Sequence, residues 1–436
     1  MFTGTDHAIT IFKAGVAAVQ PASLIREYIR PAEDGLWVGK RHFSLSRTGR
    51  LIIAGAGKAA AAMAQAVETL LPAHACEGMV ITKYNHSLPL SRVRVVEAGH
   101  PVPDENGLAA TQALLQLISS ATEQDLVLFL LSGGASALLT DLPEGSSLAD
   151  MQQLSQLLLK SGADIQEMNV VRKHLSRVKG GQLALAAYPA PICSIILSDV
   201  VGDDLAVIGS GPTVPDPSTF AEAIMLLARY GILHHTPAPI ITYLERGISG
   251  AIPETPKPGD ERFVHVYNVL AGSNQVALTA AAAKARSMGY HTEVLSSTAT
   301  GDAHVLAKQL VQTATSYQGP LPACLLMGGE STVQVKGEGM GGRNQQLALA
   351  AGIALPAGAS FVVLSAGTDG TDGPTDAAGA LVHAALMENA AQQGLDAAAY
   401  LADNDAYHFF DKAGGLIKTG PTQTNVMDLM LVLIPH

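Results

Sequence analysis

Short apolar segments alternate with longer amphipathic segments along most of the chain, and this alternation restricts the fold more than any other feature. Segments expected to be strands include 51–54, 126–131, 192–197, 264–270, 323–327, 360–364 and 429–434. A strand followed by a helix and another strand is typical of a βαβ unit, in which both strands are parallel. The sequence therefore predicts an α/β fold whose mostly parallel sheet is covered by helices on both faces.

The length and one loop-forming segment indicate two domains. The chain has 436 residues, and domains hold roughly 100–200 residues each. Residues 247–262 contain Pro253, Pro256 and Pro258 and few large apolar residues, as is typical of a connection. We therefore expect one domain over 1–247, a linker over 248–262 and a second domain over 263–436. Helices are expected over 8–30 and 377–394, among others, from the spacing of apolar residues.

Composition and charge exclude several classes of protein. The net charge of −11 disfavours a nucleic-acid partner, which needs a basic face. The longest apolar run, 126–131, is far shorter than the roughly 20 residues that span a bilayer. No basic segment followed by an apolar one begins the chain, so we expect a cytoplasmic protein. The three cysteines lack metal-binding spacing, and a homo-oligomer is neither indicated nor excluded.

The first glycine-rich turn, Gly55-Ala56-Gly57-Lys58, follows the strand at 51–54 and begins a helix. Glycine lets the backbone approach an anion closely, and a helix N-terminus attracts negative charge. The turn also fits G-x-G-x-x-A, and Glu77 lies twenty residues after Gly57, as in dinucleotide-binding sites. Lys58 instead favours direct contact with a phosphate. A plain tight turn with a solvated lysine is the structural alternative.

Two further segments are candidates for binding anions. Ser132-Gly133-Gly134-Ala135-Ser136 follows the strand at 126–131 and offers the same kind of turn, although a close-packed turn with capping serines remains the alternative. Asn169, Arg172 and Lys173 have spacings that place them near one helical face. Such a face suits a carboxylate or phosphate unless it is simply solvated.

Acidic and basic residues follow other strands. Asp199 follows the strand at 192–197, a position that suits a general base or a metal ligand. Arg343 opens a helix after two glycines and could pair with a phosphate. Asp369 and Asp372 lie in a Thr-Asp-Gly-Thr-Asp-Gly turn and could bind Mg²⁺, or could simply form turns. For His100 we expect a structural role.

These segments together resemble one family, the glycerate 2-kinases that carry a C-terminal MOFRL domain and whose bacterial members of tartrate utilisation often bear the name hydroxypyruvate reductase. The resemblance rests on stretches in the family's order over nearly the whole chain: 54–60, 99–107 (GHPVPDENG), 131–138, 169–181, 198–215, 328–330, 341–346, 368–376 and 418–425 (KTGPTQTN). It implies a Rossmann-like, doubly wound N-terminal domain, a smaller α/β C-terminal domain and an active site in the cleft between them.

The resemblance also implies an activity and its residues. The expected reaction is transfer of phosphate from ATP, with Mg²⁺, to D-glycerate, giving 2-phosphoglycerate and ADP. The family's key lysine and arginine fall on Lys58 and Arg343, and Asp199 joins them as a catalytic candidate. Substrate candidates are Asn169, Arg172, Lys173, Ser132 and Ser136, and metal candidates are Asp199, Asp369 and Asp372. Nucleotide candidates are Gly55, Gly57, Lys58, Gly133, Gly134, Gly211, Gly329, Glu330, Asn344, Thr424 and Asn425.

Two other functions compete with the kinase. The G-x-G-x-x-A turn and Glu77 favour an NAD(P)H-dependent hydroxypyruvate reductase, although this fingerprint does not explain the second glycine turn or Arg343. A non-catalytic sensor of nucleotides or sugar acids would bind ligand without turnover.

Overall fold

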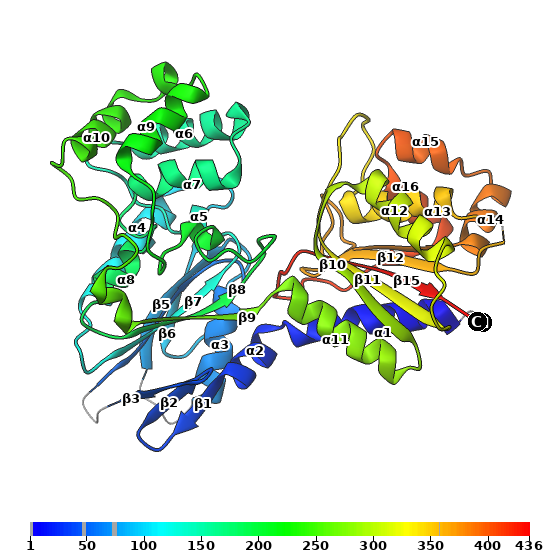
Figure 1. Ribbon diagram of the computed structural model, residues 1–436, viewed down its shortest axis with the longest axis horizontal. Coiled ribbons are helices and arrows are strands. Elements are labelled where there is room, and N and C mark those ends of the chain that lie inside the picture. The colour runs from blue at the N-terminus through cyan, green and yellow to red at the C-terminus, as the bar shows by residue number, and fades with distance from the viewer. Residues whose placement is uncertain (1–2, 46–48, 72–75, 357) are drawn as a thin grey trace. The chain divides into compact units, whose positions relative to one another are not determined.

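The computed structural model describes residues 3–45, 49–71, 76–356 and 358–436 (Figure 1). Contacts divide the chain into two compact units. The central unit comprises Leu24–Ala271, and the terminal unit combines the segment up to Ser23 with Gly272–His436. These units differ from the expected ranges, because the start of the chain joins the C-terminal part and the segment 248–262 lies inside the central unit.

The central unit is built on a six-stranded sheet with the order β6-β5-β4-β7-β8-β9. Its strands are β4 (Leu51–Ala56), β5 (Cys76–Lys83), β6 (Val93–Ala98), β7 (Leu126–Ser132), β8 (Ile192–Leu197) and β9 (Val266–Gly272). The pairs from β6 through β8 are parallel, as expected. The chain runs outward from β4 to β6 and then returns to β7 beside β4. This is the Rossmann strand order, with the topological switch point between β4 and β7.

Helices cover both faces of this sheet (Figure 1). α4 (Glu105–Ser119) and α8 (Gln182–Ala187) share an apolar core with alternate residues of β4, β7 and β8. α3 (Ala60–Leu70) lies on the opposite side. Continuous burial along β4, β7 and β8 explains why their sequences are apolar runs without alternation.

The start of the chain differs from the expected helix over 8–30, which is wrong. α1 (Thr3–Ala18) ends before Pro21, which begins the separate helix α2 (Pro21–Tyr28). Proline has no amide hydrogen and is tolerated in the first turn of a helix but not in its interior. A small antiparallel sheet follows at once, formed by β1 (Ile29–Ala32), β2 (Gly35–Val38) and β3 (Arg41–Ser44).

A group of helices in the central unit has an apolar core of its own. Most of its buried aliphatic residues, and Phe220, come from α6 (Leu148–Ser161), α7 (Ile165–His174), α9 (Phe220–Arg229) and α10 (Ala238–Ile248). The short helix α5 (Ala135–Leu138) follows β7, and single 3₁₀ turns occupy Ile208–Ser210, Leu233–His235 and Glu261–His265.

The terminal unit is built on a mixed sheet with the order β10-β11-β15-β12-β13-β14. Its strands are β10 (His291–Asp302), β11 (Ala323–Thr332), β12 (Val362–Gly367), β13 (Gly379–His383), β14 (Leu416–Ile417) and β15 (Asp428–Ile434). β10 and β11 are parallel, whereas the other four pairs are antiparallel. The expectation of a mostly parallel sheet is therefore wrong for this unit.

Helices also cover both faces of the terminal sheet (Figure 1). α1 and α11 (Asn274–Ser287) lie on one side. The other side carries α12 (Ala303–Thr315), α13 (Arg343–Ala354), α14 (Ala384–Gln392), α15 (Ala397–Ala402) and α16 (Ala406–Ala413). The expected helix over 377–394 is wrong in its first part, which forms β13. No single helix in the described ranges is long and apolar enough to cross a membrane, although the bent pair α1–α2 passes by length and composition.

Candidate active site

The carboxyl ends of β4 and β7 meet at the switch point of the central sheet, and their glycine turns are joined by hydrogen bonds. The Lys58 amide donates to the Gly133 carbonyl at 2.9 Å, and the Ala59 amide donates to Ser132 Oγ at 3.0 Å. Gly57 has φ +132°, and a Cβ there would lie 2.1 Å from Ser132 Oγ. Ser132 therefore supports the first glycine turn through its side chain. Any larger residue at position 57 would push the first turn away from the second.

These bonds change what the first turn offers to an anion. The Gly57 amide donates to the Ile81 carbonyl at 3.1 Å, so Gly57, Lys58 and Ala59 have all used their amide hydrogens. What remains for a ligand at this turn is the Lys58 side chain. In the second turn, by contrast, the amides of Gly133, Gly134 and Ala135 donate to no acceptor in the described part of the chain.

The Lys58 side chain and the His100 ring both lie against Gly134. Gly134 has φ +84°, and a Cβ there would lie 3.3 Å from Lys58 Cγ and 3.0 Å from His100 Cδ2 and Nε2. Burial and the nearby positive charges of Lys58, Lys83 and His86 together lower the pKa of His100 to about 4. A neutral imidazole beside a lysine is therefore part of this site, although the sequence alone indicated a structural histidine.

Asp199 lies on the other glycine of the same turn. Its Oδ2 would be only 1.7 Å from a Cβ on Gly133. The residue follows β8, the strand next to β7, so its carboxylate reaches the turn across one strand. The structure thus brings the candidates Lys58, Gly133, Gly134 and Asp199 close together and places His100 beside them.

A chain of side-chain hydrogen bonds connects this turn with α7. Ser136 Oγ contacts Ser210 Oγ at 2.9 Å, and Ser210 Oγ donates to Asn169 Oδ1 at 2.9 Å. Ser210 has φ +63° and Gly211 has φ +64°, and the carbonyls of these two residues accept the amides of Gly180 and Gly181. Gly211 therefore shapes a buried loop that supports Asn169 and Ser136.

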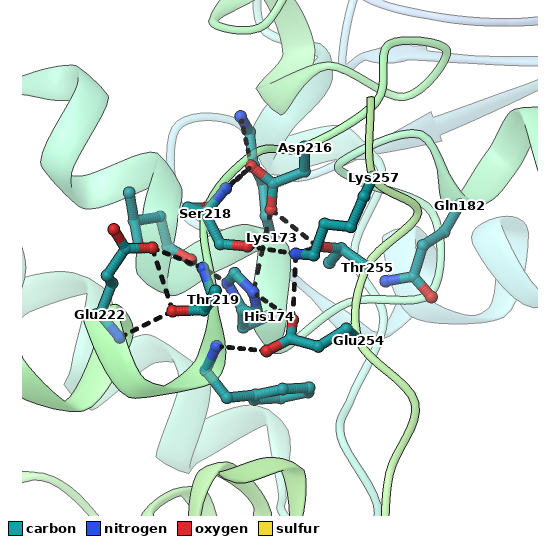
Figure 2. Close-up of polar contacts among 12 residues, drawn as sticks. Lys173, His174, Gln182, Asp216, Ser218, Thr219, Glu222, Glu254, Thr255 and Lys257 are labelled. Carbon is teal, nitrogen blue, oxygen red and sulfur yellow. Dashed lines mark hydrogen bonds and ion pairs between the residues drawn. The ribbon is translucent and has the colours of Figure 1, made fainter. Parts of the chain in front are cut away.

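Lys173 points elsewhere, into a buried polar network (Figure 2). Its Nζ pairs with Asp216 Oδ1 at 3.4 Å, and both side chains are almost fully buried. Asp216 also accepts from Thr255 at 3.0 Å, and His174 Nε2 lies 3.1 Å from Glu254. Lys257 donates to Glu254, Thr255 and the Ser218 carbonyl. These contacts fasten the segment 248–262 to α7, which explains why it is no linker between the units.

The terminal unit contains a second cluster of candidate residues, centred on Arg343 at the start of α13. Its guanidinium donates to Asp428 at 2.7 and 3.0 Å and to Glu330 at 2.7 Å. Asp428 is fully buried at the start of β15, whereas Glu330 is 44% exposed. These carboxylates raise the pKa of Arg343 despite its burial, so the group stays charged.

Asp372 caps the first turn of α13. It accepts the amides of Asn344 at 3.1 Å and Gln345 at 2.8 Å, while Asn344 Nδ2 also donates to Asp428 at 2.9 Å. Ser365 donates to Asn344 Oδ1 at 2.6 Å. Burial and the charge of Asp428 together raise the pKa of Asp372 to about 6, although the amides of Gln345 and Asn344 oppose the rise.

The remaining candidates surround this cluster without forming a metal site. Asp369 accepts the amide of Thr371 at 3.0 Å within its own turn. Thr424 is buried and donates to the Val19 carbonyl at 2.6 Å, and Asn425 accepts from Met427 at 3.0 Å. Gly329 leaves room for the Ala299 backbone. Among the described residues no group of three His, Cys, Asp or Glu side chains is arranged to hold a metal ion.

Sequence reasoning missed the residues that hold the candidates in place: Asp428, Gln345, Ser365 and Ser210. Of these, Asp428 had the clearest signal in the sequence, because it is a single carboxylate directly before six apolar residues of the strand β15. Glu77, by contrast, loses its expected role. It lies opposite Ile52 near the start of parallel β5, while the glycine turn follows the other end of β4. It pairs there with Arg50 at 3.0 Å.

The central unit is therefore a Rossmann-type protein domain with a lysine-bearing double glycine turn at its switch point. Comparisons identify the class more closely. Residues 7–245 match a family described as a domain of unknown function, DUF4147, and residues 323–428 match the MOFRL family. The chain belongs to the glycerate 2-kinase family that combines these two regions.

Individual relatives support this assignment along nearly the full chain. A D-glycerate 2-kinase of Thermotoga maritima is 42% identical, covering 98% of this chain and 97% of the relative. A glycerate 2-kinase of Pyrococcus horikoshii is 38% identical over 96% and 94%. An Agrobacterium vitis protein with a provisional hydroxypyruvate reductase name is 41% identical over 88% and 87%. The solved structure of a Thermotoga maritima glycerate kinase matches with a TM-score of 0.87 and 40% identity, covering 99% of each chain.

Proposed function

We propose that this protein is an ATP-dependent D-glycerate 2-kinase. The observation that carries the proposal is its similarity, at 38–42% identity over nearly the full length, to proteins named as glycerate 2-kinases. Lys58 at the switch point supports it, because a lysine among close-packed glycines suits a transferred phosphate.

The proposed reaction needs positioning and charge more than covalent chemistry. The 2-hydroxyl oxygen of glycerate forms a bond to the γ-phosphorus, the bond from that phosphorus to the β–γ bridging oxygen breaks, and ADP leaves. We assign Lys58 to the phosphate oxygens, with the free amides of Gly133 and Gly134. Asp199, against Gly133, is placed to accept the hydroxyl proton.

For Arg343 we propose a role in stabilising phosphate charge. Its two partners differ: Asp428 is fully buried and holds the guanidinium, whereas Glu330 is 44% exposed and is the partner that a ligand would displace. Asn344, Gly329, Thr424 and Asn425 lie in or beside this cluster, and we retain them as nucleotide candidates.

The described residues do not fit a protein-held Mg²⁺ site. Asp372 uses both carboxylate oxygens on the first turn of α13, and Asp369 uses one on its own turn. Mg²⁺ usually keeps several waters and binds through few carboxylates plus substrate phosphates. We therefore propose that it arrives with ATP and that Asp372 acts as a helix cap.

The reductase alternative loses support from the position of Glu77. A ribose-binding carboxylate belongs at the carboxyl end of the second strand, beside the glycine turn. Glu77 lies near the opposite end of β5 and pairs with Arg50. The provisional name of one relative is its remaining support.

The test is direct. Purified protein with ATP, Mg²⁺ and D-glycerate should release ADP, and phosphorus NMR should assign the product phosphate to carbon 2. ADP at background level would contradict the kinase, and saturable binding without turnover would favour a sensor. Oxidation of NADPH on adding hydroxypyruvate would favour the reductase. We further propose a cytoplasmic role in glycerate- or tartrate-type carbon catabolism.

A further inference from the structure

The face of α7 that carries Asn169 is held against the second glycine turn. Ser210 is hydrogen-bonded to both Asn169 and Ser136. Ser136 is the second residue after Gly134. Arg172 lies three residues after Asn169, on the same helical face. The same hydrogen-bonded chain that anchors Asn169 therefore sets the position of Arg172 relative to the turn.

Arg172 is a half-buried cation that lacks an acidic partner among the residues that the structure describes. Its neighbours in sequence are neutralised: Lys173 pairs with Asp216 at 3.4 Å, and Lys179 lies 4.0 Å from Asp141 and donates to the Leu139 carbonyl. Burial lowers the pKa of Arg172, and no carboxylate among the described residues opposes it. Burial also lowers the pKa of Lys179, and the charge of Arg172 adds to that effect. A desolvated positive charge of this kind is costly unless an anion neutralises it.

A second donor lies one turn away on the same face. Asn169 Nδ2 is buried and has no acceptor among the described residues, although Asn169 Oδ1 accepts from Ser210. Buried amide groups are nearly always paired, so an unpaired one marks a place where a partner is missing. Asn169 and Arg172 together offer donors to an acceptor that none of the described residues supplies.

We propose that Arg172 binds the carboxylate of the acceptor substrate, with Asn169 as its neighbouring donor, and so restricts the enzyme to small hydroxy acids. The inference rests on the proposed kinase function and deepens it. A guanidinium matches a carboxylate with two parallel hydrogen bonds. A site that pairs its buried charge with the substrate also rejects neutral polyols and amides, because these would leave the charge unpaired.

The test compares an acid with its neutral amide in two variants and a control. Arg172→Gln removes the charge, Arg172→Lys keeps it without the planar fork, and Arg177→Gln removes an exposed arginine of the same segment as the control. Thermal-shift titrations with D-glycerate and with D-glyceramide measure binding without turnover. Steady-state assays then measure KM for D-glycerate and for ATP.

In the wild type, D-glycerate should bind more tightly than D-glyceramide. Arg172→Gln should raise the Kd for D-glycerate by about 10- to 100-fold, as expected for the loss of one charged pair. Its Kd for D-glyceramide should stay within about threefold of the wild-type value. Arg172→Lys should retain part of the preference for D-glycerate over D-glyceramide. Arg177→Gln should retain the whole preference. KM for D-glycerate should rise while KM for ATP stays within about twofold of the wild type.

An unchanged preference for the acid in Arg172→Gln would overturn the inference, as would an equal loss for both ligands. A rise in KM for ATP alone would assign Arg172 to the nucleotide and would equally overturn it. Failure of the kinase proposal looks different, since the wild type would then release no ADP whatever its preference between acid and amide.

Discussion

The Lys58 side chain and the His100 ring lie so close to Gly134 that a Cβ at this position would force one of them to move. A Cβ there would lie 3.3 Å from Lys58 Cγ and 3.0 Å from the His100 ring. The position of the Lys58 side chain therefore depends on the second glycine turn, because only a glycine at position 134 leaves that side chain where it lies.

Gly134→Ala should reduce kcat by about 100-fold, because it displaces Lys58 from the phosphate. Gly145→Ala is a matched control: Gly145 has φ +85°, close to the +84° of Gly134, but a Cβ there meets nothing within 4 Å. Both variants should lose about 1–2 kcal/mol of stability from left-handed backbone strain. Equal kcat values in the two variants would show that the Lys58–Gly134 contact has no role in catalysis.

Lys58→Met keeps the length of the side chain and removes its charge. We expect kcat to fall by about 10²–10³-fold, as for the loss of one donor to a developing negative charge. The melting temperature should change little, because no other residue in the described part of the chain needs the ammonium group as an ion-pair partner. Lys160→Met, on α6, serves as the control for loss of a lysine. An unaltered kcat in Lys58→Met would remove Lys58 from the mechanism.

His100 should titrate near pH 4 in the free protein, well below its usual 6.5. Because folding lowers this pKa, the associated stability is present above about pH 6.5 and is lost as the pH falls toward 4. His100→Gln should therefore lose less stability over that interval than the wild type. Histidine NMR should also show the pKa of His100 rising when ADP binds, since a phosphate offsets the positive charges around it. A pKa near 6.5 in the free protein would contradict this account.

Asp372 should give the opposite pH dependence. Its pKa is raised to about 6, so its protonated form is favoured in the folded state. The contribution of Asp372 to the free energy of unfolding is largest below about pH 3.8. It decreases as the pH rises through 6, by about 3 kcal/mol at most. Asp372→Asn should be less stable than the wild type at low pH, because its side-chain NH2 would face the Gln345 amide, which is also a donor. Its free energy of unfolding should nevertheless depend less on pH between pH 4 and 7. The exposed Asp411→Asn should retain the wild-type slope in chemical denaturation.

Lys173 and Asp216 should affect stability and not substrate binding. Removing one member of a buried pair costs about 3–5 kcal/mol, because the other charge is left unpaired. Lys173→Met and Asp216→Asn should each destabilise the protein by that order, and the double variant by less than the sum. KM for D-glycerate in Lys173→Met, measured at a temperature where the variant is folded, should equal that of the wild type. A large rise in KM would return Lys173 to the substrate site.

The central unit could be predicted well from the sequence because its signals are local. Buried parallel strands have continuous apolar runs, and Gly57 and Gly133 follow them where close approach to Ser132 and Asp199 leaves no room for a side chain. The role of Glu77 could not be predicted, because its distance along the chain does not reveal at which end of β5 it lies.

The terminal unit was less predictable because its pairings are distant. β15 lies between β11 and β12, and only this arrangement brings Asp428 to Arg343, 85 residues away. The segment 379–383 is apolar and rich in small residues, a composition that does not distinguish a buried strand from a helix. The partners of Arg343 and Lys173 likewise depend on packing that no spacing rule describes.

The place of α1 has a consequence for how the chain matures during synthesis. α1 packs on α11, and Gly15 lies so close that a Cβ would be 3.0 Å from the Ala277 carbonyl and 2.9 Å from Leu429. The central unit, Leu24–Ala271, is contiguous and separates these partners. Domains emerge from the ribosome and fold in order, so α1 leaves the ribosome before the central unit but cannot pack on α11 and β15 until both have been made. We therefore expect chaperones to bind α1 of a nascent chain until β15 has been made.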